Sequence, residues 1–202
     1  IALLGWNPKT EQEIFSLDVL AEEFDLAKLN KAGAIFDLEK LDWMNGLYIR
    51  EKNIKELVEL CRPYLEKYSE KLSDDYLEKI IVVERERMKK LSDIAEKIEF
   101  YFEAPSYDVK ILRWKDMDDD DLKKSLNKSL DILSGIEEGD WTIENIKDKL
   151  MAEADPKNRG EMLWPLRVAL TGKEKSPSPW EVAWVVGREE SISRIKNALD
   201  KL

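Results

Sequence analysis

The 202-residue sequence contains no histidine and only one cysteine, Cys61. Without histidine, a Ser-His-Asp or Cys-His catalytic arrangement and a zinc site with histidine ligands are excluded. One cysteine can neither close an internal disulfide nor supply several metal-binding thiolates, which agrees with a reducing cytoplasm. Because Cys61 falls among apolar residues of an expected helix over 54–67, we predict a buried structural thiol.

Long apolar runs are missing as well. No stretch approaches the roughly 18 apolar residues that a membrane-spanning helix needs, so we expect no contact with a membrane interior. No basic segment followed by an apolar one stands at the start, so we expect no signal peptide and a cytoplasmic protein. The chain starts with Ile1 rather than methionine, which we interpret as a segment of a longer protein.

The net charge of −10 is distributed unevenly. Residues 156–202 carry nine Lys and Arg against six Asp and Glu, whereas the remainder is strongly acidic. Part of the negative charge is the run Asp118 to Asp121, which favours a helix start over a metal site because neighbouring side chains on a helix diverge. We therefore expect one basic face on an acidic protein, which permits nucleic-acid binding without requiring it.

Helix signals recur along the chain, and no alternating strand pattern extends beyond a few residues. Polar residues precede apolar residues at helical spacing, as helix caps do. The expected caps are Ser16, Asp37, Asn53, Ser73, Ser92, Thr142 and Ser178. We expect one long helical segment from Ser73 to Leu91, a break at Pro63, and a helix closed or distorted at Asn45-Gly46. The sequence therefore predicts an all-α protein.

A proline-containing stretch divides the helical pattern into parts. Residues 104–108 include Pro105 and read as a linker between two helical groups. We expect a helical segment over 1–52, a first helical domain over 53–105 and a second over 106–202. No internal repeat of fixed period accompanies this division.

Three sequence motifs are too specific to be explained by helix formation alone. They are ALLGWNP at 2–8 with EIFS at 13–16, AIFDLEKLDWMNGLYIR at 34–50, and LWPLRVALTG at 163–172, which is followed by SP at 176–177, WEV at 180–182 and Gly187. In this order and spacing, the chain resembles bacterial-type glutamyl-tRNA synthetases essentially from end to end. In that family the first stretch lies just beyond the KMSKS loop, and the second belongs to the region that contacts the tRNA stem.

The resemblance implies two small helical anticodon-binding domains preceded by a helical stem-contact segment. It separates the chain from the glutaminyl enzymes, whose anticodon domains are β-barrels. The implied partner is tRNA(Glu), bound by a monomer, and the implied whole enzyme joins glutamate to tRNA with ATP and magnesium. The HIGH-like and KMSKS-like motifs are absent from this sequence. We therefore expect this chain to hold no catalytic residue, metal or cofactor of its own.

Arg87 is the sharpest candidate for anticodon recognition. It lies in the segment ERERM, 84–88, where the resemblance places an arginine near the last anticodon base in enzymes that discriminate between tRNAs. Cytosine presents two acceptors, N3 and O2, to the donors of a guanidinium, whereas guanine presents N–H groups. Glutamate and glutamine anticodons differ in that base, C against G. The alternative is an ordinary helix-surface ion pair with Glu84 or another carboxylate.

Four further residues match the anticodon pocket of the family, and each has a plainer alternative. Arg167 matches an anticodon arginine; its alternative is a buried ion pair that supports the core. Ser176 and Pro177 match a loop beside the anticodon, although many relatives have threonine where this chain has Ser176. Trp180 offers a stacking surface to an unpaired base, or is a core tryptophan.

The stem-contact candidates are predicted to position tRNA without reading its sequence. Lys40 and Arg50 would contact phosphate or ribose, and Arg85 would touch RNA at phosphate. Asn45 is a weaker candidate because the Asn-Gly pair has a structural alternative.

Two functions of other classes are alternatives to RNA recognition. A helical protein-interaction scaffold that binds no RNA gains slight support from the negative charge, and salt-insensitive or absent RNA binding would favour it. A hydrolase that uses pairs of acidic residues has no supporting pattern in the sequence.

Overall fold

The computed structural model describes residues 2–29 and 36–202, and all regular secondary structure in these ranges is helical. The α-helices are α1 (Ala2–Gly5), α2 (Leu17–Glu23), α3 (Leu38–Glu51), α4 (Ile54–Cys61), α5 (Asp74–Glu84), α6 (Asp93–Lys97), α7 (Glu99–Phe102), α8 (Asp119–Ser134), α9 (Ile143–Glu153), α10 (Gly160–Thr171), α11 (Pro179–Val186) and α12 (Arg188–Leu199). Short 3₁₀ turns are η1 (Leu26–Lys28), η2 (Arg62–Tyr64), η3 (Glu66–Lys71), η4 (Arg85–Arg87), η5 (Val109–Leu112) and η6 (Glu138–Asp140). The all-α prediction is confirmed.

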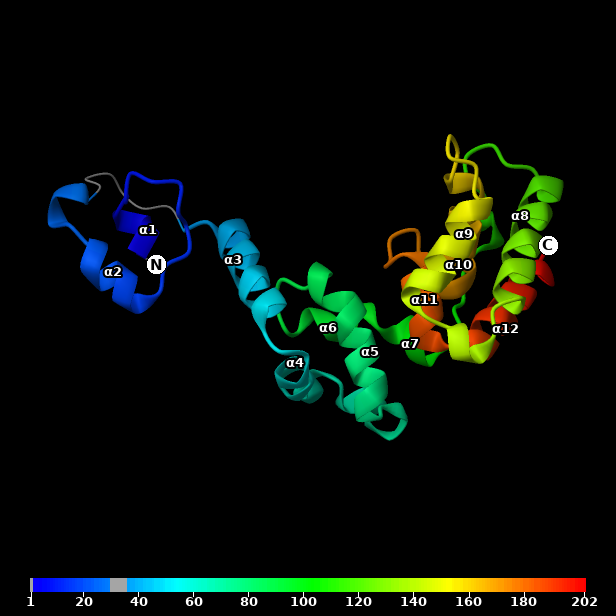
Figure 1. Ribbon diagram of the computed structural model, residues 1–202, viewed down its shortest axis with the longest axis horizontal. Coiled ribbons are helices and arrows are strands. Elements are labelled where there is room, and N and C mark those ends of the chain that lie inside the picture. Colours follow the sequence, from blue (N-terminus) through cyan, green and yellow to red (C-terminus); the bar gives the residue numbers. More distant parts are fainter. Residues whose placement is uncertain (1, 30–35) are drawn as a thin grey trace.

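The helices are arranged along an elongated body (Figure 1). Helices α1 and α2 lie at one end, α3 leads away from them, and α4 to α6 form the middle. Helix α7 connects this middle part to the group α8 to α12, in which α8 packs against α10 and α12. Helix α11 contacts both α9 and α5, so the middle part and the last group share an interface.

Most of the predicted capping residues begin helices. The side chains of Ser16, Asp37, Asn53, Ser73 and Thr142 each accept a hydrogen bond from a backbone N–H of the following turn. At α11, the N–H of Ser178 donates to Glu181 Oε2 at 2.7 Å, which is one half of a capping box. Ser92 precedes α6 as predicted, but its side chain accepts no capping hydrogen bond, and the helical path toward Phe102 is interrupted at Ile98.

The expected break at Pro63 is confirmed, but two other helix predictions are wrong. Helix α3 continues through Asn45 and Gly46 to Glu51, and a Cβ at Gly46 would lie 3.1 Å from the Met88 carbonyl oxygen. Glycine at this position therefore favours close backbone packing, and the helix does not end there. The segment expected to be helical up to Leu91 leaves the α-helix at Glu84, after which η4 follows. Ala34 and Ile35 of the second motif lie outside the described residues.

One contiguous set of buried apolar side chains runs from Ile49 in α3 to Ala198 in α12. Cys61 belongs to this core with no exposed surface, which confirms the predicted buried thiol. Large apolar side chains that remain exposed are concentrated between Leu17 and Tyr64. In the described part of the chain, no helix has the length and apolar character needed to cross a bilayer.

The burial of Cys61 makes a direct prediction about its reactivity. Desolvation raises the pKa of this thiol to about 11, so it stays protonated at pH 8, and the core also blocks access. We expect iodoacetamide to modify the folded chain slowly and the denatured chain rapidly, as followed by mass spectrometry. Equal rates in the two states would show that Cys61 is not held in the core.

Candidate nucleic-acid interface

Four of the five residues predicted at the anticodon line one cavity. The cavity has a volume of about 390 Å³ and lies where η4, α7, α10 and the loop before α11 meet. Its lining includes Arg87, Arg167, Ser176 and Pro177. These residues come from segments separated by up to 90 positions, so the fold has gathered them, while their contact with RNA stays a prediction.

Arg87 is positioned by the turn that follows α5. Its exposed side chain ends the 3₁₀ turn η4, and its carbonyl oxygen accepts a hydrogen bond from Lys97 Nζ at 2.6 Å. The next residues are held by Asp93, whose Oδ2 accepts from the backbone N–H groups of Lys89 and Lys90 at 2.9 and 3.1 Å. Within the described residues, Arg87 makes no ion pair shorter than 4.0 Å. The guanidinium is therefore available at the rim of the cavity.

Arg167 lies half-buried on α10, facing the same cavity. Its Nε is buried and has no hydrogen-bond partner in the described part of the chain. Burial lowers the pKa of Arg167, and the charge of Arg87 lowers it further, while Glu181 acts in the opposite direction. No carboxylate there lies within ion-pair distance of Arg167. Two neighbouring guanidinium groups without partners favour a ligand that brings hydrogen-bond acceptors.

The loop between α10 and α11 closes one side of the cavity. Gly172 ends α10 in the left-handed conformation, with φ of 66°, which turns the chain toward Ser176. The Ser176 hydroxyl donates to the carbonyl oxygen of Pro177 at 2.9 Å, and Pro177 is buried. The hydroxyl oxygen of Ser176 keeps its lone pairs and can still accept a hydrogen bond from a base.

Glu84 is a buried carboxylate that lines this cavity, and sequence reasoning did not identify it as a site residue. It is the last residue of α5 and only 1% exposed, and its Oε1 accepts a hydrogen bond from the Tyr101 hydroxyl at 2.9 Å. Burial raises the pKa of Glu84, against the hydrogen bond from Tyr101 and the charges of Arg87 and Lys97. A glutamate in an amphipathic helix reads as a surface residue, so no signal in the sequence marks it.

Arg194 was also missed, and it holds the two sides of the cavity together. This residue of α12 is 3% exposed, and its Nη1 donates to the carbonyl oxygens of Phe100 and Leu170, both at 2.6 Å. Its Nε donates to Glu190 at 2.7 Å. Phe100 lines the cavity from α7, and Leu170 lies on α10 beyond Arg167. The buried guanidinium thus links α7 to α10.

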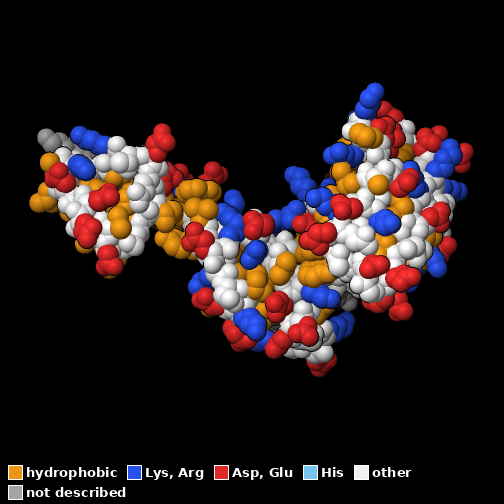
Figure 2. Space-filling view, in the orientation of Figure 1, with side chains coloured by type: hydrophobic (Ala, Val, Ile, Leu, Met, Phe, Trp, Pro, Cys, Tyr) orange, Lys and Arg blue, Asp and Glu red, His pale blue; other side chains and the backbone are white. Residues whose placement is uncertain are grey.

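The surface around the cavity is concave and carries many cations. Figure 2 shows Lys and Arg side chains, interspersed with Asp and Glu, along the hollow edge between the middle of the body and the last helical group. Lys97, Lys173 and Lys175 are further cations that line the cavity, beyond those predicted. Lys173 and Lys175, in the loop before Ser176, belong to the basic excess of residues 156–202. That excess was the signal for them in the sequence.

Residues 56–199 match the family model described as "Anticodon binding domain". The chain belongs to the anticodon-binding domain family. Along its whole length it is also similar to proteins named glutamate–tRNA ligase: 42% identical over 209 residues to that of Clostridium botulinum (strain Eklund 17B / Type B) and 41% to that of Clostridium tetani (strain Massachusetts / E88). This chain covers 42% of each relative, so it spans less than half of their length.

Solved structures agree with this assignment. The glutamate tRNA ligase of Elizabethkingia meningosepticum, in complex with its amino acid, matches 100% of this chain with a TM-score of 0.78 and 32% identity. Glutamate-tRNA synthetase from Elizabethkingia anophelis matches 98% with a TM-score of 0.76, also at 32% identity. The chain covers 40% and 39% of those two structures. The helical fold of this anticodon-binding domain is therefore shared with glutamate-tRNA ligases.

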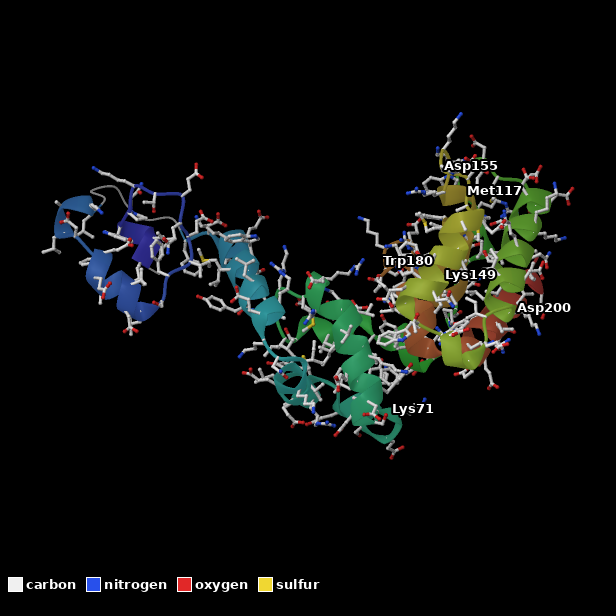
Figure 3. The ribbon with its side chains drawn as sticks, in the orientation of Figure 1. Lys71, Met117, Lys149, Asp155, Trp180 and Asp200 are labelled. Carbon is white, nitrogen blue, oxygen red and sulfur yellow. The ribbon has the colours of Figure 1, made fainter. Side chains whose placement is uncertain are left out.

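Trp180 is the one predicted anticodon residue that does not line the cavity of the anticodon-binding domain. It lies in the first turn of α11, partly buried against the core. In Figure 3 it stands on the side of α11 that faces the hollow, away from Asp200 at the far side of the group. The structure therefore gives Trp180 a core contact, and its stacking on a base stays a prediction.

None of the four stem-contact candidates lines the cavity of the anticodon-binding domain. Lys40 pairs with Glu13 at 2.5 Å, and the Asn45 amide donates to the carbonyl oxygen of Lys89. Arg50, in the last turn of α3, has no ion pair within 4.0 Å among the described residues. Arg85, in η4, has a buried Nε without a hydrogen-bond partner there. Among the three charged candidates, only Arg50 has neither a carboxylate partner in the described residues nor a buried donor without a hydrogen bond.

Proposed function

We propose that this chain is the tRNA-binding part of a glutamate–tRNA ligase and that it recognises the anticodon of tRNA(Glu). The observation that supports this most directly is the cavity in which Arg87 and Arg167 meet without a carboxylate partner in the described residues. Unpartnered donors at the edge of a cavity suit the acceptor-rich edge of an unpaired base. The similarity to ligases over the whole chain supports the same conclusion.

Arg87 is proposed to read the last anticodon base. Its guanidinium can donate to N3 and O2 of cytosine, the base at this position in glutamate tRNAs. Guanine, the base in glutamine tRNAs, would present its own N–H groups to the arginine. Because buried donors would then stay unpaired, the wrong base loses about 1–3 kcal/mol of binding free energy. Arg167, Ser176 and Pro177 complete this pocket, and Trp180 would stack on a neighbouring base.

The remaining parts of the proposal concern the tRNA stem and the whole enzyme. Lys40, Asn45, Arg50 and Arg85 would contact the tRNA backbone, which positions the RNA without reading it. The chain would divide into a stem-contact segment, 1–52, and anticodon-binding parts over 53–105 and 106–202. The whole ligase would be a cytoplasmic monomer that charges tRNA with glutamate by using ATP and magnesium, with its catalytic residues outside this chain.

Replacing Arg50 by alanine is predicted to weaken RNA binding uniformly. Its charge lies at the end of α3 without a carboxylate partner in the described ranges, so it suits a phosphate and carries no base specificity. We expect the affinity for whole tRNA to fall by a similar factor for every anticodon sequence, and the salt dependence to become shallower by about one unit. A loss confined to one anticodon would contradict a positioning role.

Fluorescence anisotropy tests the proposed function directly. The chain is titrated at low salt into a labelled anticodon stem-loop of tRNA(Glu), and into the same RNA with its last anticodon base changed from C to G. Tighter binding to the C form, with affinity that falls steeply as salt rises, supports anticodon recognition. Equal binding to both forms would reduce the contact to phosphates. No binding to either form or to whole tRNA would overturn the proposal in favour of a protein-interaction scaffold.

A further inference from the structure

Resting on the proposed function, we infer that Glu84 is a second specificity residue of the cavity and accepts a hydrogen bond from the exocyclic amino group of the base read by Arg87. The two residues lie three positions apart, at the end of α5 and the end of η4, and both line the cavity. The change from α-helix to 3₁₀ turn between them thus accompanies a carboxylate and an arginine that line the same cavity.

The carboxylate of Glu84 has acceptor capacity to spare. An ionised carboxylate offers about four lone-pair sites on its two oxygens. In the described residues, its only hydrogen bond is from the Tyr101 hydroxyl to Oε1, and no Lys or Arg lies within 4.0 Å. The other oxygen accepts no hydrogen bond from the described residues, so it can accept one from a ligand in the cavity. Tyr101 is a buried residue of α7. Its hydroxyl binds one carboxylate oxygen of Glu84 and leaves the other oxygen available.

The pairing edge of cytosine supplies the missing donor. Cytosine presents two acceptors, O2 and N3, followed by one donor, the N4 amino group. Arg87 can satisfy only the two acceptors, because a guanidinium has no acceptor of its own. A carboxylate beside the arginine completes the pattern, since Glu and Asp accept hydrogen bonds from cytosine N4. Uracil carries O4 in place of that amino group and would bring an acceptor toward Glu84.

The two residues would therefore contribute differently to the exclusion of wrong bases. Arg87 rejects guanine, whose pairing edge meets its N–H groups with other N–H groups. Glu84 adds to the rejection of uracil, whose O4 would face a carboxylate oxygen while its N3–H faces the donors of Arg87. This division of roles distinguishes base reading from a purely structural role of Glu84, because removing a structural carboxylate would weaken binding to every RNA by the same factor.

The decisive measurement removes the amino group from the RNA and leaves the protein unchanged. Anticodon stem-loops are made with cytosine, guanine, uracil or 2-pyrimidinone, which is cytosine with hydrogen in place of the amino group, at the last anticodon position. We expect the unaltered chain to bind the 2-pyrimidinone form about tenfold more weakly than the cytosine form. Equal affinities for these two forms would overturn the inference, even where a preference for C over G upholds the proposed function.

The variant Glu84→Gln tests the protein side. A neutral amide keeps the size of the side chain and a bond to Tyr101, but hydrogen bonds to a charged acceptor are roughly twice as strong. For this variant, replacing cytosine by 2-pyrimidinone should weaken binding only about threefold. The preference for cytosine over uracil should also shrink, because the amide can donate to O4. The preference for cytosine over guanine should stay. Unchanged discrimination against uracil and 2-pyrimidinone would overturn the inference.

Glu96→Gln is the matched control. Glu96 lines the same cavity but is exposed, so the substitution changes the charge of the cavity by the same amount without altering its buried lining. We expect its binding to all four RNAs to rise slightly and in parallel. Circular dichroism establishes whether Glu84→Gln folds, and if it does not, the comparison of cytosine with 2-pyrimidinone on the unaltered chain decides alone.

Discussion

Replacing Arg87 by glutamine is expected to bring the affinities for anticodons ending in C and in G to within a small factor of each other. A glutamine amide can both donate and accept, so it tolerates the N–H groups of guanine that a guanidinium cannot satisfy. The discrimination that is lost corresponds to about 1–3 kcal/mol, which is on the order of tenfold to a hundredfold in relative affinity. Anisotropy titrations of the two stem-loops with each protein measure it.

Lys175→Gln provides the control for this substitution. Lys175 is exposed and lines the same cavity, so its replacement removes one positive charge without removing the guanidinium. We expect it to weaken binding to both stem-loops in parallel, as a nonspecific electrostatic contact would. If Arg87→Gln preserves the full preference for C, then Arg87 does not read the last anticodon base, whatever its contribution to affinity.

Replacing Arg194 by methionine is expected to destabilise the fold by about 3 kcal/mol. The methionine fills part of the space but leaves the buried carbonyl oxygens of Phe100 and Leu170 without their donor. For a chain of this length, that loss lowers the melting temperature by roughly 10 °C. Thermal unfolding followed by circular dichroism at a single protein concentration provides the measurement.

A second expectation separates this role of Arg194 from a general loss of packing. Because α12 joins α7 to α10 through this guanidinium, RNA binding by the cavity should weaken in Arg194→Met even at temperatures where the chain is folded. The control is Arg113→Met, which removes a pair with Asp119 on the surface and should cost less than about 1 kcal/mol. Equal melting temperatures for the two variants would refute the proposed link.

Local signals predicted where helices begin better than where they end. Asp37 and Ser73 mark helix starts because their side chains bond to the backbone N–H groups of the next turn, an interaction contained within four residues. The end of α5 at Glu84 has no such local cause. It depends on η4 packing against α3, where Gly46 meets the Met88 carbonyl. The prediction of a longer helix failed because the packing of η4 against α3 joins segments that are distant in the sequence.

In the candidate site, too, the sequence identified residues but did not determine how each one is oriented. Arg87, Arg167, Ser176 and Pro177 were named from motifs, and the fold brings all four to one cavity. Trp180 came from the same motif as Ser176, yet it packs partly against the core and does not line the cavity. Spacing along a chain does not specify which side of a helix will be covered, since that depends on the helices packed against it.

The sequence by itself determined the helical class, most helix starts, the buried thiol and the family to which the chain belongs. These properties depend on short-range patterns of apolar spacing, capping and motif order. Only the tertiary structure decided that Glu84 is buried and lines the same cavity as Arg87, and that Arg194 links α7 to α10. Both are charged residues that a helical pattern assigns to solvent. Their burial follows from partners up to 94 positions away, whose hydroxyl and carbonyl groups offset the cost of removing charge from water.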